Sequence, residues 1–407
     1  MPRTDTVVIG AGHAGLAVSR CLADREVPHV VLDRGRIGER WRTARWDGFR
    51  MLTPNWLSRL PGWAYAGPDP DGFMSAGDLV DHLVAYSGSF GAPVLEQTRV
   101  TRVEPAARGF TVRTDRGVWA ARNVVVATGY HSYATVPDLA AGLTPDVAQT
   151  TAARYRSPAG LPEGGVLVVG ASASGVQIAY DLVRGGRRVL LATGAHTRLP
   201  RRYRGRDILW WLDRVGALDR RVDDRVAVGE PSLQLVGGSG PRGIDLGALQ
   251  DAGVRLTGRL RGLRKEVAVF ADDLADTVGS AQARLDRTLT TIDRYAAASG
   301  TSLAPPDRPP VVAVPATPST VDLRRTGITT VVWATGYRPR YPWLAVPVLD
   351  HDGRIHHRRG VTQVPGLYAI GLRMQHRRNS TFVDGARHDA TYLVDRIAAD
   401  RPVRSAV

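Results

Sequence analysis

Two short glycine-rich segments, about 160 residues apart, constrain the fold of this chain more than any other feature. The sequence Gly-Ala-Gly-His-Ala-Gly occupies residues 10–15 after an apolar run at residues 7–9, and Gly-Ala-Ser-Ala-Ser-Gly occupies residues 170–175 after an apolar run at residues 166–169. Such a pattern is typical of a buried parallel strand, a turn, and a helix whose N-terminal amides and dipole face a pyrophosphate. One such loop predicts one dinucleotide site. Two in one chain predict two dinucleotides with electron transfer between them.

The residues that follow the first loop fit an adenosine without a 2′-phosphate. A second apolar run, residues 29–32, ends in Asp33. An acidic side chain roughly twenty residues beyond the loop is where a ribose hydroxyl is bound. We therefore expect FAD at the first loop.

The second loop has Ser172 where the first has its middle glycine, and the strand expected at residues 187–193 ends without an acid. Five arginines follow between residues 198 and 206. Guanidinium groups bind phosphate bidentately, so this pattern favours the 2′-phosphate of NADPH over NADH. Arg198 and Arg202 are the residues that we expect to serve it. The alternative is an ordinary solvated surface, because the chain uses arginine throughout.

Length and composition narrow the class of protein. A chain of 407 residues suits two domains better than one core. No stretch approaches the ~20 apolar residues of a membrane span, and the first strand begins by Thr6, so we expect a soluble cytoplasmic protein that binds no membrane. Cys21 is the only cysteine, which argues against the disulfide reductases that also carry two dinucleotide loops.

The formal charge of +15 does not by itself indicate a nucleic-acid partner. Of the 54 basic residues only Lys265 is a lysine, a skew typical of a GC-rich genome, and no segment interleaves arginines with aromatic residues. The sequence therefore predicts no nucleic-acid binding. It also predicts no metal site, because His351, His356 and His357 flank an Asp-Gly turn and fit a solvated hairpin.

The order of the motifs predicts an α/β chain with two Rossmann-like dinucleotide-binding domains, the second inserted into the first. A strand expected at residues 123–126 is followed by Ala-Thr-Gly-Tyr, and a strand expected at residues 330–333 is followed by the same four residues. This echo indicates related units whose small-residue turns let the chain pass between them. We expect an FAD-binding domain at residues 1–160 and 328–407, with an NADPH-binding domain at residues 161–327.

A long amphipathic helix is expected within the second domain. Apolar residues recur at helical spacing from Asp272 to Ala298, and a proline-rich connector follows at residues 305–318. The helix either packs on its own domain, caps the active site, or forms a homodimer contact.

Together with the loops and the paired turns, the segment Gly-Glu-Arg-Trp at residues 38–41, followed by Arg-Trp-Asp at 45–47, resembles the class B flavoprotein monooxygenases. This group includes flavin-containing monooxygenases, amine N-hydroxylases, Baeyer–Villiger enzymes and the auxin-forming plant enzymes. The resemblance implies FAD contacts at Gly10, Gly12, His13, Ala14, Gly15, Asp33, Arg34, Arg40, Trp41, Val100, Thr128, Gly129, Gly371 and Asp384. It implies NADPH contacts at Gly170, Ser172, Ala173, Ser174, Gly175, Ala334, Thr335 and Gly336, beside Arg198 and Arg202.

The family signature before the second loop, Phe-x-Gly-x-x-x-His-x-x-x-Tyr, is largely absent. If Tyr155 is its tyrosine, then Pro145, Val147 and Thr151 stand at the other three positions, and another alignment places Gln149 near the histidine position. This departure leaves an NADPH oxidase, or a reductase that passes electrons to another acceptor, as the alternative function, and a non-catalytic flavin-binding protein as a third.

The chemistry implied by the resemblance is monooxygenation. NADPH reduces FAD, the reduced flavin adds O₂ at C4a to form a (hydro)peroxyflavin, and one oxygen enters a small amine, sulfide or carbonyl substrate. Asn55 falls where the family places a polar residue against flavin and nicotinamide, and it is the one catalytic candidate. Its other interpretation is a turn residue after Pro54.

Overall fold

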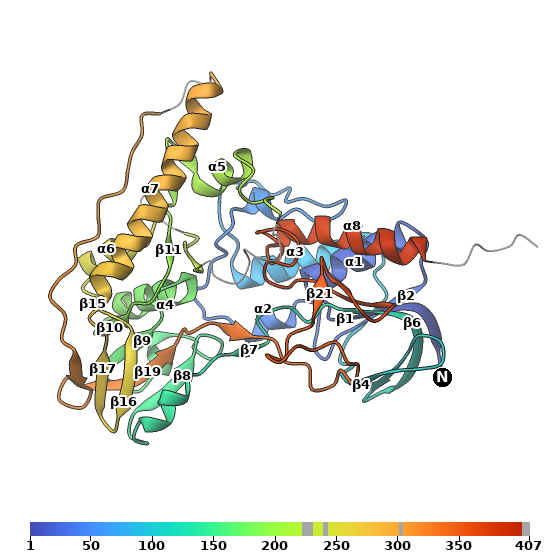
Figure 1. The fold of residues 1–407 in the computed structure, drawn as a ribbon, viewed down its shortest axis with the longest axis horizontal. Coiled ribbons are helices and arrows are strands. Elements are labelled where there is room, and N and C mark those ends of the chain that lie inside the picture. The colour runs from blue at the N-terminus through green and yellow to red at the C-terminus, as the bar shows by residue number, and fades with distance from the viewer. Residues whose placement is uncertain (222–230, 239–242, 301–303, 401–407) are drawn as a thin grey trace, which may run out of the picture.

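A computed structural model describes residues 1–221, 231–238, 243–300 and 304–400. Two sheets with their helices lie side by side (Figure 1). The nine-stranded sheet has the order β21-β22-β23-β6-β1-β2-β3, with β4 and β5 attached through β6. The five-stranded sheet has the order β15-β10-β9-β19-β8 and is parallel throughout. The expected α/β class with two dinucleotide-binding units is confirmed by this arrangement and by the folds of similar proteins described below.

The strands of the first sheet are β1 (Arg3–Ile9), β2 (His29–Leu32), β3 (Val94–Leu95), β4 (Val100–Pro105), β5 (Phe110–Thr114), β6 (Gly117–Val126), β21 (His357–Arg358), β22 (Val361–Thr362) and β23 (Leu367–Ala369). Those of the second are β8 (Ala148–Thr151), β9 (Gly165–Val169), β10 (Val189–Ala192), β15 (Arg255–Thr257) and β19 (Ile328–Trp333). Three strand pairs are β7 (Tyr133–Ala134) with β20 (Tyr337–Arg338), β11 (Thr197–Arg198) with β14 (Leu233–Gln234), and β12 (Arg202–Tyr203) with β13 (Arg206–Asp207). A three-stranded sheet contains β16 (Leu260–Arg264), β17 (Val267–Phe270) and β18 (Thr320–Asp322).

The α-helices are α1 (His13–Ala23), α2 (Glu39–Thr43), α3 (Ala76–Ser89), α4 (Ala173–Arg184), α5 (Ile208–Arg214), α6 (Leu246–Asp251), α7 (Leu274–Ala298) and α8 (Val383–Ala399). Three 3₁₀ turns lie at Asn55–Leu57, Asp138–Gly142 and Pro158–Gly160. No helix in the described part of the chain is long and apolar enough to cross a membrane.

The two central strands explain why each sheet forms. In β1, Val7 and Val8 are fully buried and pair in parallel with β2 on one side and β6 on the other. In β9, residues 166–169 pair in the same way with β10 and β19. One face of each strand packs against helices, and the other packs against antiparallel strands, β4 and β5 for β1 and β16 and β17 for β9. A strand buried on both faces must be apolar at successive positions, and both runs are.

The strand pairing draws the boundary between the units differently from the sequence expectation. β8 lies before residue 160 and β19 lies after residue 327, yet both belong to the second sheet. β8 has the sequence Ala-Gln-Thr-Thr at a sheet edge, so it lacks the apolar run that would have marked it. The chain leaves the first sheet after β6 and returns after β19, and the two crossing segments pair as β7 and β20.

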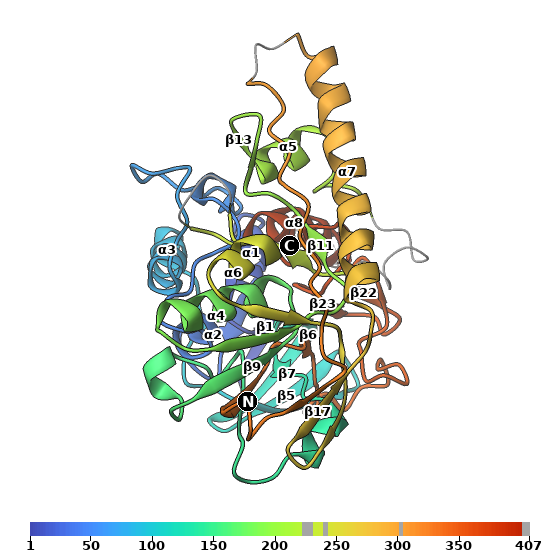
Figure 2. The same ribbon diagram turned by 90° about the vertical axis from the view of Figure 1, so that its left-hand side faces the viewer.

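The long helix expected at residues 272–298 is observed as α7, which runs along the outer side of the second unit and projects beyond it (Figures 1 and 2). Its stripe packs in a cluster with α5, where Leu285, Leu289 and Ile292 lie with Trp211 and Leu212. Residues of α7 are not among the described residues that line the two cavities below. The stripe therefore packs within the chain, and the homodimer contact stays a prediction.

Candidate active site

The first glycine-rich loop is shaped by two glycines that the backbone itself requires. Gly10 has a φ of +115°, and a Cβ there would lie 2.6 Å from the carbonyl oxygen of Ala127. A Cβ on Gly15 would lie 1.9 Å from the carbonyl oxygen of Gly10, so α1 can approach β1 only without one. Gly12 differs, because a Cβ there would meet no described atom within 4 Å. The open space beside Gly12, at the N-terminus of α1, is where an anion can approach the helix amides.

Asp33 stands where β2 ends and supports the same loop. Its Oδ2 accepts a hydrogen bond of 2.7 Å from the amide of Ala11, and its Oδ1 accepts one of 2.8 Å from Gly35. Burial raises the pKa of the carboxyl above its usual range. A carboxylate has more acceptor positions than these two bonds use, so a ribose hydroxyl can still bind.

A cavity of about 520 Å³, the first cavity, opens at this loop and extends past Asp33, Trp41 and Trp343. Twelve residues that the sequence assigned to FAD line it: Gly10, Gly12, His13, Ala14, Asp33, Arg34, Arg40, Trp41, Val100, Thr128, Gly129 and Gly371. An open approach at Gly12, an acid at the strand end and a long cavity are the features that a flavin dinucleotide requires.

The second loop repeats the geometry of the first. Gly170 has a φ of +108°, with a virtual Cβ 2.5 Å from the carbonyl oxygen of Ala334, and a Cβ on Gly175 would lie 1.8 Å from the carbonyl oxygen of Gly170. Ser172 is the N-cap residue of α4. A second cavity, of about 470 Å³, is lined by Ser172, Ala173, Ser174, Ala334, Thr335 and Gly336 from the sequence-based set. Gly170 and Gly175 instead shape the backbone, as Gly15 does in the first loop.

The two cavities share a wall, here called the junction, made of His13, Trp41, Arg45, Tyr130, His131 and Thr381. Burial lowers the pKa of His13 to about 4. Burial, with the charges of Arg45 and Arg40, lowers the pKa of His131 to about 3. Burial lowers the pKa of Arg45 to about 10. At neutral pH both histidines are therefore uncharged and Arg45 is cationic.

Arg198 and Arg202 do not lie where the NADPH prediction needs them. Arg198 is 3% exposed, and its guanidinium donates to Asp245 at 2.5 Å, to Gln282 at 2.5 Å and to the carbonyl oxygen of Pro310 at 2.7 Å. Arg202 is exposed in the β12–β13 hairpin. The Arg198 guanidinium is thus already occupied by protein partners and Arg202 faces solvent, so the structure lends no support to an NADPH role for either residue.

Asn55 holds a loop in place. Its Nδ2 donates to the carbonyl oxygen of Asp69 at 2.8 Å, and its Oδ1 accepts from the amide of Met74 at 2.9 Å. The residue is buried and is not among the described residues that line either cavity. Its contacts match the turn interpretation rather than the catalytic one.

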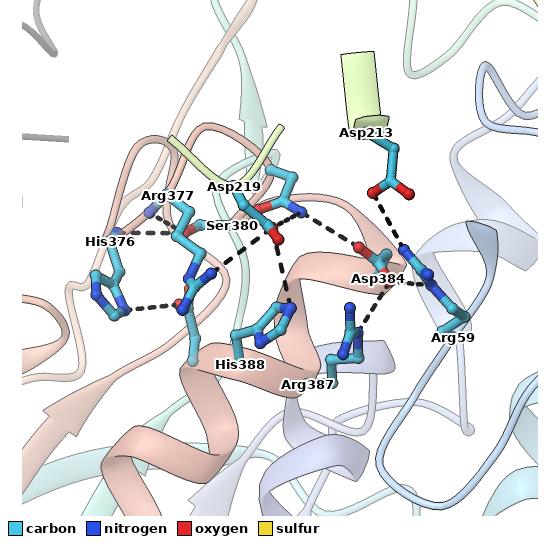
Figure 3. A network of polar contacts seen from close by, with 11 residues as sticks. Arg59, Asp213, Asp219, His376, Arg377, Ser380, Asp384, Arg387 and His388 are labelled. Atoms are coloured by element: carbon cyan, nitrogen blue, oxygen red, sulfur yellow. Dashed lines mark hydrogen bonds and ion pairs between the residues drawn. The ribbon is translucent and has the colours of Figure 1, made fainter. Parts of the chain in front are cut away.

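Asp384 belongs to a polar network that fastens the start of α8 (Figure 3). Its carboxylate is 1% exposed and accepts from Arg59 at 2.6 Å and from Arg387 at 3.0 Å, while Arg59 lies 3.5 Å from Asp213 of α5. The neighbouring residues Thr381, Phe382 and Val383 line the second cavity, whereas Asp384 is not among its described lining residues. Asp384 thus positions the N-terminus of α8 instead of lining a cavity.

Sequence reasoning gave no role to His131 or Arg45. His131 directly follows the first Ala-Thr-Gly-Tyr turn, and Arg45 was noted only as part of the family segment. Their proximity to recognised motifs was the available signal. Nothing in the sequence shows that the two motifs meet.

Known proteins of similar sequence and structure agree with this geometry. A family model described as pyridine nucleotide-disulphide oxidoreductase matches residues 7–204. A protein of Geobacillus kaustophilus, described as an uncharacterized CzcO-like oxidoreductase, is 31% identical over 97% of this chain and 98% of its own length. The probable indole-3-pyruvate monooxygenase YUCCA4 of Arabidopsis thaliana is 31% identical over 44% of each chain. A flavin-containing monooxygenase from Stenotrophomonas maltophilia superposes with a TM-score of 0.66 at 20% identity, covering 98% of this chain and 99% of its own.

The fold, the paired loops and the adjoining cavities define a protein with two dinucleotide-binding units. The chain belongs to the family of the CzcO-like oxidoreductases, and it is similar to flavin monooxygenases over part of its sequence and in its fold.

Proposed function

We propose that this enzyme is an NADPH-dependent monooxygenase that inserts one oxygen of O₂ into a small amine, sulfide or carbonyl compound. We assign FAD to the first cavity and NADPH to the second. The observation that carries the proposal is the junction, because two cofactors exchange a hydride only where their reactive rings meet.

Bound FAD supplies the redox and oxygen chemistry, and the chain supplies position and shelter. The helix N-termini of α1 and α4 hold the two pyrophosphates, and Asp33 accepts from a ribose hydroxyl. Trp46, Leu212 and Leu218 are buried and give the second cavity an apolar wall. Such a wall keeps water from the reacting atoms.

The altered family signature carries less weight against oxygen insertion than the sequence suggested. Thr151, which stands at the histidine position, ends the edge strand β8. Tyr155 donates a 2.6 Å hydrogen bond to Asp181. Pro145, Val147, Thr151 and Tyr155 are not among the described residues that line either cavity. The alteration therefore affects the sheet edge beside the site, and it does not weigh against the monooxygenase.

The deciding experiment measures NADPH oxidation and H₂O₂ release together on the FAD-loaded protein. We expect thioanisole, a tertiary amine or a cyclic ketone to lower the H₂O₂ formed per NADPH, with one ¹⁸O atom from ¹⁸O₂ in the product. Stoichiometric H₂O₂ with every compound would replace this proposal with an NADPH oxidase. NADPH oxidation that requires an added electron acceptor would indicate a reductase.

For the choice of NADPH, we infer that Arg284 of α7 takes the role first given to Arg198 and Arg202. The 2′-phosphate of a Rossmann-bound nucleotide lies beyond the end of the second strand, which here is β10 followed by Thr193. Arg284 donates to the carbonyl oxygen of His196 at 2.8 Å, and its shielded Nε has no hydrogen-bond partner among the described residues. Arg259, also near this segment, is held by Asp273 at 2.6 Å.

Replacing Arg284 tests this inference. Loss of one charge-assisted phosphate contact costs about 1.5–3 kcal/mol, so Arg284→Ala should lower kcat/KM for NADPH roughly 10- to 150-fold and leave NADH nearly unchanged. Arg202→Ala is the matched control and should change neither value. An equal loss with both nucleotides in Arg284→Ala would contradict the assignment.

A further inference from the structure

Arg45 is the side chain at the junction whose charge has no evident counterpart. It lies just beyond α2 and lines both cavities. Its guanidinium carbon lies 4.3 Å from the ring centre of Trp41 and 5.2 Å from that of Phe49. Two aromatic rings thus hold the planar group, so its position is fixed before any cofactor binds.

The charge of Arg45 is not neutralised by a nearby acid. One Nη donates to the carbonyl oxygen of Ala44 at 2.7 Å, and the shielded Nε has no hydrogen-bond partner among the described residues. No ion pair of Arg45 occurs within the described parts of the chain. The described residues that line the second cavity include neither aspartate nor glutamate. The first cavity has Asp33 and Glu39, but Asp33 accepts from the amides of Ala11 and Gly35, and Glu39 pairs with Arg36.

The other polar groups at the junction leave the charge in place. His13 and His131 are uncharged at neutral pH, for the reasons given above. The ring of His131 lies against Tyr337, with 5.1 Å between ring centres. Arg40, which lines the first cavity, adds a second positive charge and donates to the carbonyl oxygen of Ser132. The junction is therefore electropositive without a compensating carboxylate.

This arrangement matters for a ring that gains electrons. A hydride carries two electrons and one proton, so its transfer from NADPH leaves NADP⁺ and gives the flavin one additional negative charge. A fixed cation in a water-poor site binds the charged form of a group more strongly than its neutral form. We propose that Arg45 is the residue that selectively stabilises the reduced flavin and so sets the reduction potential of the bound FAD.

The inference rests on the assignment of FAD to the first cavity and not on oxygen insertion. Stoichiometric H₂O₂ release in the experiment above would refute the monooxygenase proposal and would leave the proposed role of Arg45 unchanged. The two ideas can therefore fail separately.

The test is the midpoint potential of FAD bound to the wild type, Arg45→Met and Arg45→Lys, measured by equilibrium reduction with a reference dye. Affinity for oxidised FAD is measured in parallel by fluorescence. In Arg45→Met the ratio of reduced-form to oxidised-form affinity should fall about 10- to 100-fold, which is a potential about 30–60 mV lower for a two-electron couple. Arg45→Lys keeps the charge and should recover most of the shift.

Arg50→Met is the matched control, since Arg50 lines the second cavity but not the first and has Asp78 at 3.9 Å. It should leave the potential close to that of the wild type. An unchanged potential in Arg45→Met would overturn the proposal, as would an equal loss of affinity for oxidised and reduced FAD. If Arg45→Met retains no FAD, Arg45→Gln keeps a donor for Ala44 and carries the same expectation. If both neutral variants lose FAD while Arg45→Lys keeps it, Arg45 binds oxidised and reduced FAD alike, and the proposed selectivity for the reduced form is wrong.

Discussion

The buried ion pair between Arg198 and Asp245 gives the sharpest test of a structural role for Arg198. Arg198 ties three elements together, because its partners are Asp245 at the start of α6, Gln282 on α7 and Pro310 in the connector. Asp245 also caps α6 by accepting from the amide of Ala248. We expect Arg198→Met to destabilise the protein and to leave the choice between NADPH and NADH unchanged.

The size of the loss follows from the burial of the pair. Removing one partner of a buried ion pair costs about 3–5 kcal/mol, because the other charge is left without compensation. The Asp245 side chain is 20% exposed, so water can reach it, and the lower end of about 3 kcal/mol applies. Asp245→Asn keeps the cap and breaks the pair. The double variant should lose less than the sum of the two single variants, by about 0.5–3 kcal/mol.

Urea unfolding followed by tryptophan fluorescence gives the stability, and steady-state kinetics with both nucleotides give the selectivity. An Arg198→Met protein of wild-type stability whose kcat/KM falls with NADPH alone would refute the reasoning. Arg198 would then serve the 2′-phosphate, as the sequence first suggested.

Three further predictions concern the glycine loop, Asn55 and acid stability. Gly12→Val should abolish FAD binding, seen as loss of the flavin absorbance, and should leave the stability of the apoprotein unchanged. Gly15→Ala should destabilise the apoprotein, because the added Cβ would clash with the carbonyl group of Gly10. Asn55→Ala should lower the free energy of unfolding by about 1–3 kcal/mol by freeing two backbone groups. If Asn55→Ala instead kept wild-type stability and reduced the flavin ten times more slowly, the catalytic role of Asn55 would be supported. Burial lowers the pKa of His13 to about 4, so the histidine of the unfolded chain becomes protonated at a higher pH than that of the folded chain. The free energy of unfolding should therefore fall as pH drops from about 6.5 towards 4. His13→Gln should make the urea midpoint depend less on pH over this range.

Local patterns carried most of the fold. An apolar run, a glycine turn and an amphipathic helix are encoded within about 30 contiguous residues, so both loops and the strands before them were predictable. The stripe from residue 272 to 298 likewise specified α7, observed at Leu274–Ala298. β8 was not predicted, because the sequence Ala-Gln-Thr-Thr at a sheet edge has no such pattern.

Side-chain partners were not predictable, because they are distant in sequence. Asp245 is 47 residues from Arg198 and Gln282 is 84 residues from it. A run of arginines after a strand therefore looks the same whether it binds phosphate or stabilises the interior. The junction poses the same problem, since it joins His13, Arg45 and His131 from three separate segments.

The pairing of the two crossing segments accounts for how such separate segments meet. Tyr130 and His131 lie shortly before β7, Gly336 precedes β20, and Tyr337 begins β20, which pairs with β7. The same residues line the second cavity, so the chain crosses between the units at the junction itself. Inserting the second unit at this point brings two loops about 160 residues apart to opposite sides of one wall. Any change in the relative orientation of the units must act on the β7–β20 pair, and through it on the groups between the two cofactors.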